Sequence, residues 1–292
     1  MSTPTHITPG RTTTSREARE QARSRKARRA LLISSVSTVA VIGGLIVILI
    51  TSPGWSAVKE TFFSWSAFKS SFPSVLRGFW LDVRMFMVIE VVVLAAGLLI
   101  ALCRTIRLAA LFPLRLLSVV FVDVMRGVPT ILIVYLIGFG IPALGLAGLP
   151  TSEIVLGSLA LALCYSAYVS EVYRAGIESI HPSQSAAALA LGLTARQSLR
   201  HVVLPQAVRR VAPPLLNDFI SLQKDVALVS ILGPVEAFRA AQIYGASTFN
   251  YTPMLAAAAL YLCVTIPLTR IVDRMQSRAR TQRGAAIALG PR

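Results

Sequence analysis

The sequence predicts an all-α membrane protein, a polytopic helical bundle of about six transmembrane helices. Of its 292 residues, 54% are hydrophobic and only 14% are charged, which is too apolar a composition for a soluble globular domain. The apolar residues form long blocks, and a helix needs roughly 20 of them to cross a bilayer. We therefore predict spans at about 31–51, 79–102, 116–141, 153–173, 211–233 and 252–270.

The first span, 31–51, is predicted to be a retained helix. It is longer than the apolar core of a usual signal peptide, and no small-residue cleavage site clearly follows it. The next segment, 52–77, places aromatic residues among polar ones. This pattern is typical of an interfacial helix, so we predict an outer loop that contains one.

The second span precedes a basic stretch with Arg104, Arg107 and Arg115. The third contains Pro129, which is expected to interrupt its helix. An uncharged Pro/Gly-rich turn at 142–152 leads into the fourth span. The longest internal polar stretch then separates the fourth span from the fifth.

The two termini are strongly basic. Residues 1–30 carry eight Lys/Arg and residues 270–292 carry six, out of 29 in the chain. Positive residues beside spans mark the cytoplasmic side, so we predict an inner-membrane protein with both termini cytoplasmic. We interpret 1–30 as a disordered tail and 276–292 as a second basic tail, both solvated near anionic membrane lipid; nucleic-acid binding is the alternative that we do not favour.

The polar stretch 178–206 predicts two short helices around a glycine corner. Pro182 suits the first turn of a helix, and Gly192 stands where a helix ends in a left-handed residue. Thr194 and Gln197 have the spacing of a capping box for a second helix, which Leu204–Pro205 is expected to terminate. A short helix of small residues outside the membrane suits docking into a groove of another protein.

The same stretch resembles the signature loop of ATP-binding-cassette (ABC) importer permeases. The signature is Glu-Ala-Ala, then Gly after three residues, and then, after nine more residues, an apolar residue, any residue, Leu and Pro. It is matched in register, with Ala186 in place of the glutamate, by Ala187, Ala188, Gly192, Val202, Leu204 and Pro205. Flanking segments resemble the polar amino-acid (histidine/glutamate/glutamine/arginine/opine) importers: RGFWLDV at 77–83, VDVMRGVPTIL at 122–132, SAYVSEVYRAGI at 166–177 and PPLLNDFISLQKDVALVSILG at 213–233.

This resemblance implies the fold of an ABC type I importer permease and the partners of one. A five-helix core at 78–275 would follow the additional first helix. An ABC ATPase subunit would dock on 178–206 and bind the ATP, an external solute-binding protein would deliver an amino acid, and a second permease chain would complete the path. The chain departs from the family pattern at Ala186, at Val226 and Ala227 in the usual Lys-Asp/Glu-Thr-Ser-Leu run, and at Asp82, where a threonine is usual.

The fifth span carries a polar stripe. Its members fall within an arc of roughly 120° on one helix face, and they are Asn217, Asp218, Ser221, Lys224 and Asp225. Because ionisable groups in a membrane are costly, they normally face a cavity or a partner. The stripe is either a path for a zwitterion or a set of structural pairs, and Asp82 with Arg84 could act in the same way nearer the entrance.

Two further charged sets lie near span ends. Asp123 and Arg126, one turn apart before Pro129, could form an ion pair that anchors the helix or could line the path. Glu171, Arg174 and Glu178 have the spacing of a surface ion-pair ladder. Either set could be structural or belong to the path.

The sequence lacks the motifs of common catalytic sites. It contains no G-x-x-x-x-G-K-[ST] phosphate loop, no H-E-x-x-H and no G-x-S-x-G. We therefore expect a transport subunit without catalytic residues, metal or cofactor of its own. The alternatives are an ion-coupled secondary transporter or channel that needs no ATPase and, from another class, a membrane-embedded enzyme.

Overall fold

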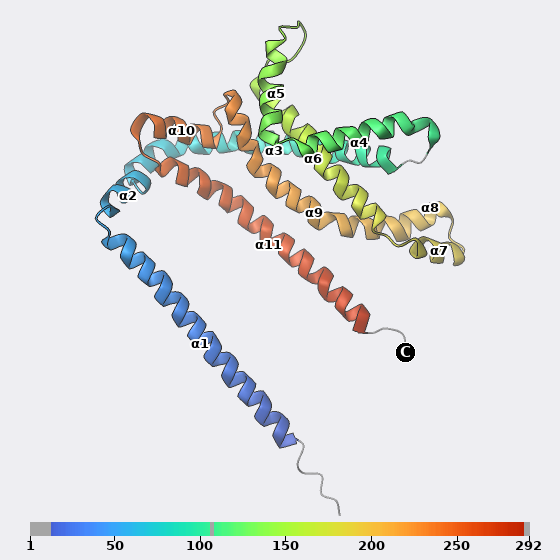
Figure 1. Ribbon diagram of the computed structural model, residues 1–292, viewed down its shortest axis with the longest axis horizontal. Coiled ribbons are helices and arrows are strands. Elements are labelled where there is room, and N and C mark those ends of the chain that lie inside the picture. The colour runs from blue at the N-terminus through green and yellow to red at the C-terminus, as the bar shows by residue number, and fades with distance from the viewer. Residues whose placement is uncertain (1–12, 106–107, 289–292) are drawn as a thin grey trace, which may run out of the picture. The chain divides into compact units, whose positions relative to one another are not determined.

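The computed structural model describes residues 13–105 and 108–288, and every regular element in these ranges is a helix (Figure 1). The chain divides into two compact units, residues 1–60 and 61–292. Four described helices are long and apolar enough to cross a membrane, and two bent helix pairs raise the number to six if each pair is one span. The predicted all-α class is confirmed, and the prediction of six spans holds on that condition.

The first unit contains α1 (Thr13–Thr51), whose stretch Arg28–Thr51 is apolar enough to span a bilayer. The prediction of a disordered tail at 1–30 is wrong for residues 13–30, which are helical. The segment holds alanine, glutamate and arginine, which are strong helix formers, and these continue the helix of the span. Residues 1–12 lie outside the described residues.

The predicted outer loop at 52–77 is shorter in the structure. A short helix, α2 (Trp55–Phe62), is followed by α3 (Trp65–Thr105), which continues without interruption through the predicted second span. Aromatic residues at helical spacing stabilise the start of α3, because Phe68 stacks on Trp65 at 5.3 Å and on Phe72 at 4.9 Å between ring centroids. These aromatic residues therefore lie in the first turns of the long helix, and α2 is the separate short helix of the segment.

The predicted interruption at Pro129 is confirmed. After the turn η1 (Ala109–Leu111), α4 (Phe112–Gly127) and α5 (Thr130–Ala143) meet at an angle of 105° (Figure 1). Val128 is extended, with φ −97° and ψ 135°, as expected of a residue that precedes proline. The chain therefore turns sharply at this point.

The centre of the second unit is α6 (Glu153–Glu178), which packs against α3, α4, α5 and α9. Glycines permit the closest approaches. A Cβ at Gly97 of α3 would overlap Val169 of α6, and one at Gly157 of α6 would overlap Val229. Ala101 of α3, one turn after Gly97, is also fully buried.

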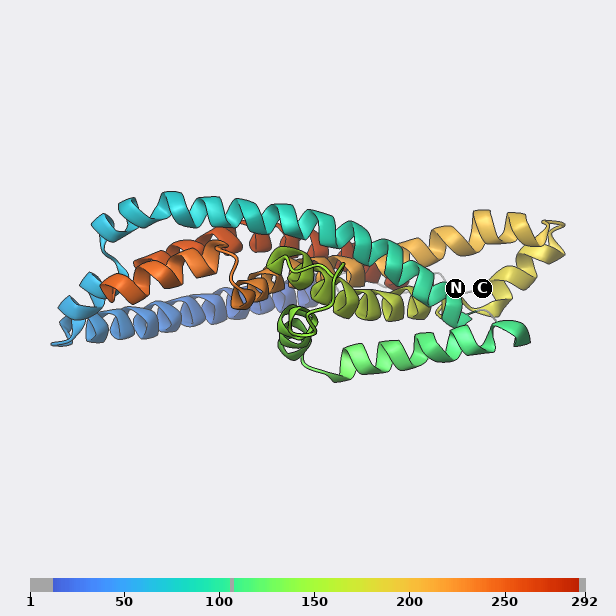
Figure 2. The same ribbon diagram turned by 90° about the horizontal axis from the view of Figure 1, so that it is seen from above.

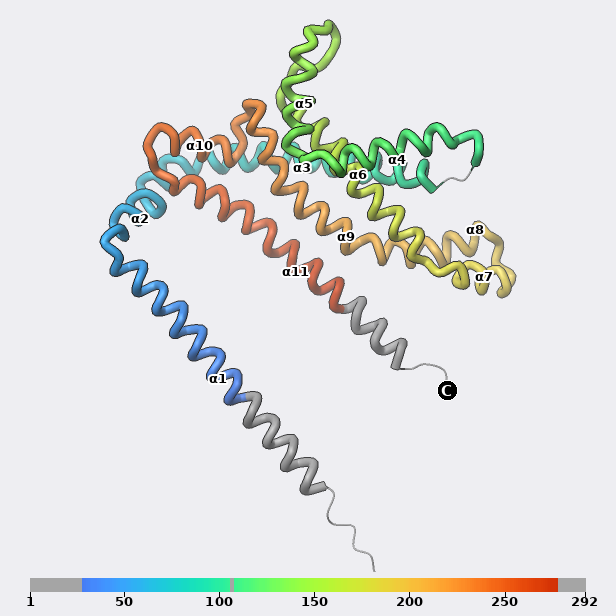
Figure 3. The backbone as a smooth tube through the Cα atoms, viewed as in Figure 1, coloured from blue at the N-terminus to red at the C-terminus, as the bar shows by residue number. Residues whose placement is uncertain are grey.

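The last third of the chain contains α9 (Leu204–Asp225), the 3₁₀ helix η3 (Val226–Leu232), α10 (Ala237–Thr248) and α11 (Thr252–Ala288). Figures 2 and 3 show how these segments follow one another in the second unit. The helix of the predicted fifth span, α9, begins at Leu204, before that span, and α11 continues beyond the predicted sixth span as far as Ala288. The helix α10 was not predicted, because its cap is a glutamate, Glu236, whose carboxylate accepts hydrogen bonds from the amides of Phe238 (2.7 Å) and Arg239 (2.6 Å).

Candidate functional site

The predicted docking segment, 178–206, forms a helical hairpin at one end of the second unit (Figure 1). Its first helix, α7 (Pro182–Ala190), ends in a Schellman motif, in which the Leu193 amide donates to Ala188 (3.1 Å) and the Gly192 amide to Leu189 (3.0 Å). Gly192 has φ +85°, which a glycine adopts without strain. The predicted glycine corner is confirmed.

The second short helix, α8 (Ala195–Ser198), begins with the predicted capping box. The Gln197 amide donates to the Thr194 hydroxyl (3.3 Å), and the Gln197 side chain accepts from the Thr194 amide (2.8 Å). The prediction that Leu204–Pro205 ends this helix is wrong, because a π-helical turn, Leu199–Val203, leads directly into α9. Pro205 lies in the first turn of α9, a part of a helix that tolerates proline.

Part of the hairpin surface is apolar. Ala186 and Ala187 are exposed, whereas Ala188 is only 3% exposed and packs inside the hairpin. Leu189 and Leu191 were not predicted as docking residues, yet both are exposed, Leu191 by 84%. The sequence signal for these two residues was the presence of leucines beside the predicted glycine corner, in a segment outside the membrane. Large exposed apolar side chains mark contact surfaces.

Polar contacts attach the hairpin to the helices that carry it. The guanidinium of Arg210 on α9 donates to the carbonyl of Ser179, just after α6. Gln206 of α9 donates to the side chain of Gln184 on α7 at 3.3 Å. A movement of the hairpin is therefore expected to move the ends of α6 and α9.

The polar stripe of α9 lines a cavity of about 310 Å³ between α5, α6 and α9. Four of the five predicted residues contribute to it: Asp218, Ser221, Lys224 and Asp225. The fifth, Asn217, is exposed and lies outside the residues that line the cavity. The opposite wall was not predicted and consists of Thr130, Tyr165 and Tyr168.

The cavity presents charges of both signs. The Tyr165 hydroxyl donates to the Asp225 carboxylate at 2.7 Å, which fixes one oxygen of that group. One oxygen of Asp218 is buried and has no hydrogen-bond partner among the described residues, while Lys224 is exposed. Two carboxylates, an ammonium and hydroxyls thus surround one small space, and such a set can accept both ends of a zwitterion.

Asp82 and Arg84 do not form the predicted pair. Two positions apart on α3, they lie on different faces: Arg84 is exposed and Asp82 is 2% exposed. The Asp82 carboxylate accepts from the Tyr261 hydroxyl at 2.8 Å and from the Ala237 amide at 3.4 Å. Asp82 therefore joins α3 to α10 and α11, and a Cβ at Gly78, one turn earlier, would overlap the backbone of Glu236.

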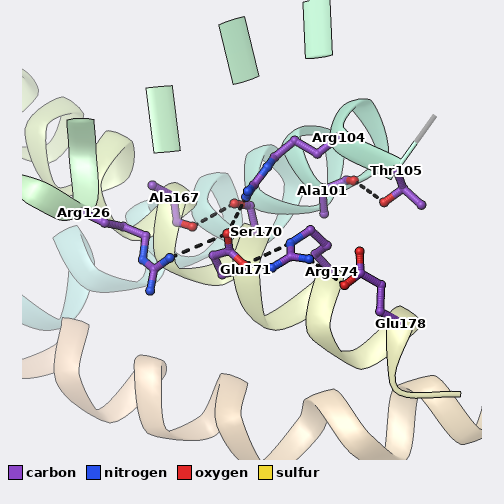
Figure 4. A network of polar contacts seen from close by, with 9 residues as sticks. All are labelled: Ala101, Arg104, Thr105, Arg126, Ala167, Ser170, Glu171, Arg174 and Glu178. Atoms are coloured by element: carbon purple, nitrogen blue, oxygen red, sulfur yellow. Dashed lines mark hydrogen bonds and ion pairs between the residues drawn. The ribbon is translucent and has the colours of Figure 1, made fainter. Parts of the chain in front are cut away.

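A cluster of charged residues surrounds Glu171 near the end of α6 (Figure 4). Its carboxylate lies 2.7 Å from Arg104 of α3, 2.7 Å from Arg174 of α6 and 3.6 Å from Arg126 of α4, and Arg174 also lies 2.5 Å from Glu178. The predicted ladder along α6 is confirmed, but Glu171 is only 18% exposed and joins three helices.

The predicted ion pair between Asp123 and Arg126 is not present. The guanidinium of Arg126 lies beside Glu171 and above the ring of Tyr168, 5.7 Å from the ring centroid. Asp123 is exposed on the same helix. A carboxylate on another helix, at a more enclosed position, competes better for the cation than an exposed one a turn away.

Comparison with known proteins identifies the class of this chain. Residues 105–281 match the family model for the binding-protein-dependent transport system inner membrane component. The chain is 30% identical to the arginine transport system permease protein ArtQ of Bacillus subtilis over 72% of this chain and 94% of that protein. It is 32% identical to the glutamate/aspartate import permease protein GltK of Escherichia coli over 74% of this chain and 98% of that one.

A solved structure shares the fold. The crystal structure of an amino acid ABC transporter with histidines contains a chain that superposes with a TM-score of 0.65 and 29% identity, covering 74% of this chain and 98% of that one. The helical architecture is therefore that of a type I ABC importer permease. The chain belongs to the family of binding-protein-dependent transport system inner membrane components, as a permease subunit of an ATP-driven ABC importer.

Proposed function

We propose that this permease carries an α-amino acid across the inner membrane, and that the cavity between α5, α6 and α9 is where the substrate binds on its way. Membership of the family makes the chain a transport subunit, which works with a separate ATPase and a substrate-binding protein. The observation that carries the proposal is the presence of both charge signs in the cavity. The relatives compared above are named for arginine and for glutamate or aspartate, so the class we propose is α-amino acids.

The cavity offers a partner for each charged end of such a substrate. A bare amino acid in a dry path would lose several kcal/mol of hydration per charged group. Lys224 can receive the carboxylate, and the unpartnered oxygen of Asp218 can receive the ammonium. Asp225 is already bonded by Tyr165, which leaves Asp218 as the more available acceptor.

The partners are proposed to bind at opposite ends of the permease. The ATPase docks on 178–206, where the apolar residues Ala187, Leu189 and Leu191 are exposed. Both termini lie in the cytoplasm on the same side as this segment, as supported by the 14 of 29 Lys/Arg in residues 1–30 and 270–292. The binding protein delivers substrate on the other side, and a second permease chain, identical or a sister, completes the path.

Reconstitution tests this function. The permease, its ATPase and its binding protein are placed in liposomes, and uptake of radiolabelled amino acids is measured against ATP hydrolysis across a substrate panel. We expect Lys224→Met to stop uptake while the protein still accumulates and binds the ATPase, because the docking segment is unchanged. The matched control is Lys69→Met, which removes an exposed lysine of α3 and should leave uptake intact.

The opposite results would refute the proposal. If Lys224→Met accumulates normally and transports as the unaltered protein does, the lysine has no part in the path. If no amino acid in the panel is transported or stimulates ATP hydrolysis, the substrate class is wrong.

A further inference from the structure

One face of α6 connects the candidate cavity with the docking segment. Tyr168 lines the cavity, Glu171 lies one turn later, and Arg174 and Glu178 continue the same row (Figure 4). The helix ends at Glu178, and the carbonyl of the next residue is held by α9. Since a helix is rigid over so few turns, a displacement of the docking segment reaches Glu171 directly.

Arg126 of α4 contacts two members of this row, Glu171 and Tyr168. Its guanidinium lies 3.6 Å from the Glu171 carboxylate and 5.7 Å from the centroid of the Tyr168 ring. These distances fit a weak ion pair and a cation–π contact. Figure 4 shows Arg126 reaching toward Glu171 from the side opposite Arg174.

The Arg126 contact is not needed to neutralise Glu171. One carboxylate oxygen already accepts from Arg104 at 2.7 Å, and the other accepts two hydrogen bonds from Arg174 at 2.7 and 3.1 Å. The side chain of Arg104 is 11% exposed, whereas that of Arg126 is 44% exposed. Arg126 is therefore the member of the cluster that can move toward or away from Glu171 at small cost.

The position of Arg126 in the chain links it to the cavity a second time. It lies in the last turn of α4, immediately before the 105° bend, and α5 begins after the bend at Thr130, which lines the cavity. A pull on Arg126 therefore acts on the bend that places Thr130. Arg126 is thus linked to Tyr168 by a direct contact and to Thr130 through the chain, and both of these residues line the cavity.

We propose that Arg126 is a positioning residue that couples the docking segment to the substrate cavity, by holding Glu171 and the Tyr168 ring together in one of the two conformations of the transport cycle. This inference rests on the proposed function of the cavity. When ATP moves the docking segment, Glu171 moves with α6 and Arg126 transmits the movement to the bend between α4 and α5. Without Arg126 the ATPase still hydrolyses ATP, but the cavity opens and closes less often per cycle.

The test is the coupling ratio, the number of substrate molecules transported per ATP hydrolysed, in liposomes that contain the complete importer. We expect Arg126→Gln to lower this ratio by roughly two- to thirtyfold, the range for residues that carry coupling between sites. Arg126→Lys keeps the charge but loses the flat guanidinium, so its coupling ratio should lie between that of the unaltered importer and that of Arg126→Gln. The matched control is Arg115→Gln, an exposed arginine of the same helix, which should keep the unaltered ratio.

A second pair of variants separates coupling from folding. Tyr168→Leu removes the ring, whereas Tyr168→Phe retains it. The first should lower the coupling ratio more than the second, which removes only a hydroxyl of the cavity wall. Arg126→Gln combined with Tyr168→Leu should be no worse than the more severe single change. If Arg126→Gln does not accumulate in the membrane, the two Tyr168 variants decide the question.

The inference is overturned if Arg126→Gln and Tyr168→Leu keep the unaltered coupling ratio, or if uptake and ATP hydrolysis fall only in proportion to the amount of protein. Its failure is distinct from failure of the proposed function. If only the inference fails, the unaltered importer still transports an amino acid. If the proposed function fails, the unaltered importer transports none.

Discussion

Replacement of Gly192 by alanine is expected to loosen the docking segment by a calculable amount. A Cβ added at this position would have no heavy atom within 4 Å, so the substitution introduces no clash. The cost is that of the backbone alone, because φ is +85° and the left-handed conformation costs an ordinary residue about 1–2 kcal/mol. With 1.4 kcal/mol for each factor of ten, the hairpin should open about five to thirty times more often.

The frequency of this opening can be measured as the rate of amide hydrogen exchange, by mass spectrometry on the permease in nanodiscs. The amides to follow are those of Leu191, Gly192 and Leu193, which donate to carbonyls at the end of α7. Their exchange should accelerate by the same factor, while the amides of α6 keep their rates. Gly192→Asn is the matched variant, and its increase should be smaller because asparagine tolerates the left-handed region. Equal rates in Gly192→Ala and the unaltered protein, or an equal increase in both variants, would refute the argument.

Two further predictions concern docking and topology. Ala187→Asp places a charge on the exposed apolar surface of α7 and should weaken co-purification of the ATPase without lowering the amount of permease; undiminished co-purification would show that the ATPase binds elsewhere. In a background without the three native cysteines, Leu146→Cys lies in the exposed turn between α5 and α6 and should react with a membrane-impermeant thiol reagent in intact cells. Labelling only after permeabilisation would contradict the proposed orientation.

The features that the sequence predicted correctly depend on residues close together in the chain. The Schellman motif at Gly192, the capping box of Thr194 and Gln197, and the interruption at Pro129 each involve backbone groups within a few residues. The physical requirements of such motifs are local, so residue type and spacing suffice to identify them. The same holds for the ladder from Glu171 along α6, whose members are one turn apart.

The two predicted charged pairs that failed depend on partners far away in the chain. Arg126 could pair with Asp123 by spacing, and only the packing of α4 on α6 places Glu171 beside it. Asp82 likewise contacts Tyr261, 179 positions later. Long-range partners are set by tertiary packing, which helical periodicity in one segment does not contain.

The candidate cavity shows both cases in a single site. Its α9 wall was visible in the sequence, because charged residues in a span are costly and their common face can be calculated from the helical repeat. Its α6 wall consists of Tyr165 and Tyr168, and tyrosine in an apolar span is equally compatible with a membrane interface or a packed core. What distinguishes these two tyrosines is the partner of each, since Tyr165 donates to Asp225 and the ring of Tyr168 lies under Arg126. An uncharged side chain thus acquires its role from the charge that tertiary packing brings to it, which is why the charged half of a polar site can be inferred from sequence and the neutral half requires the structure.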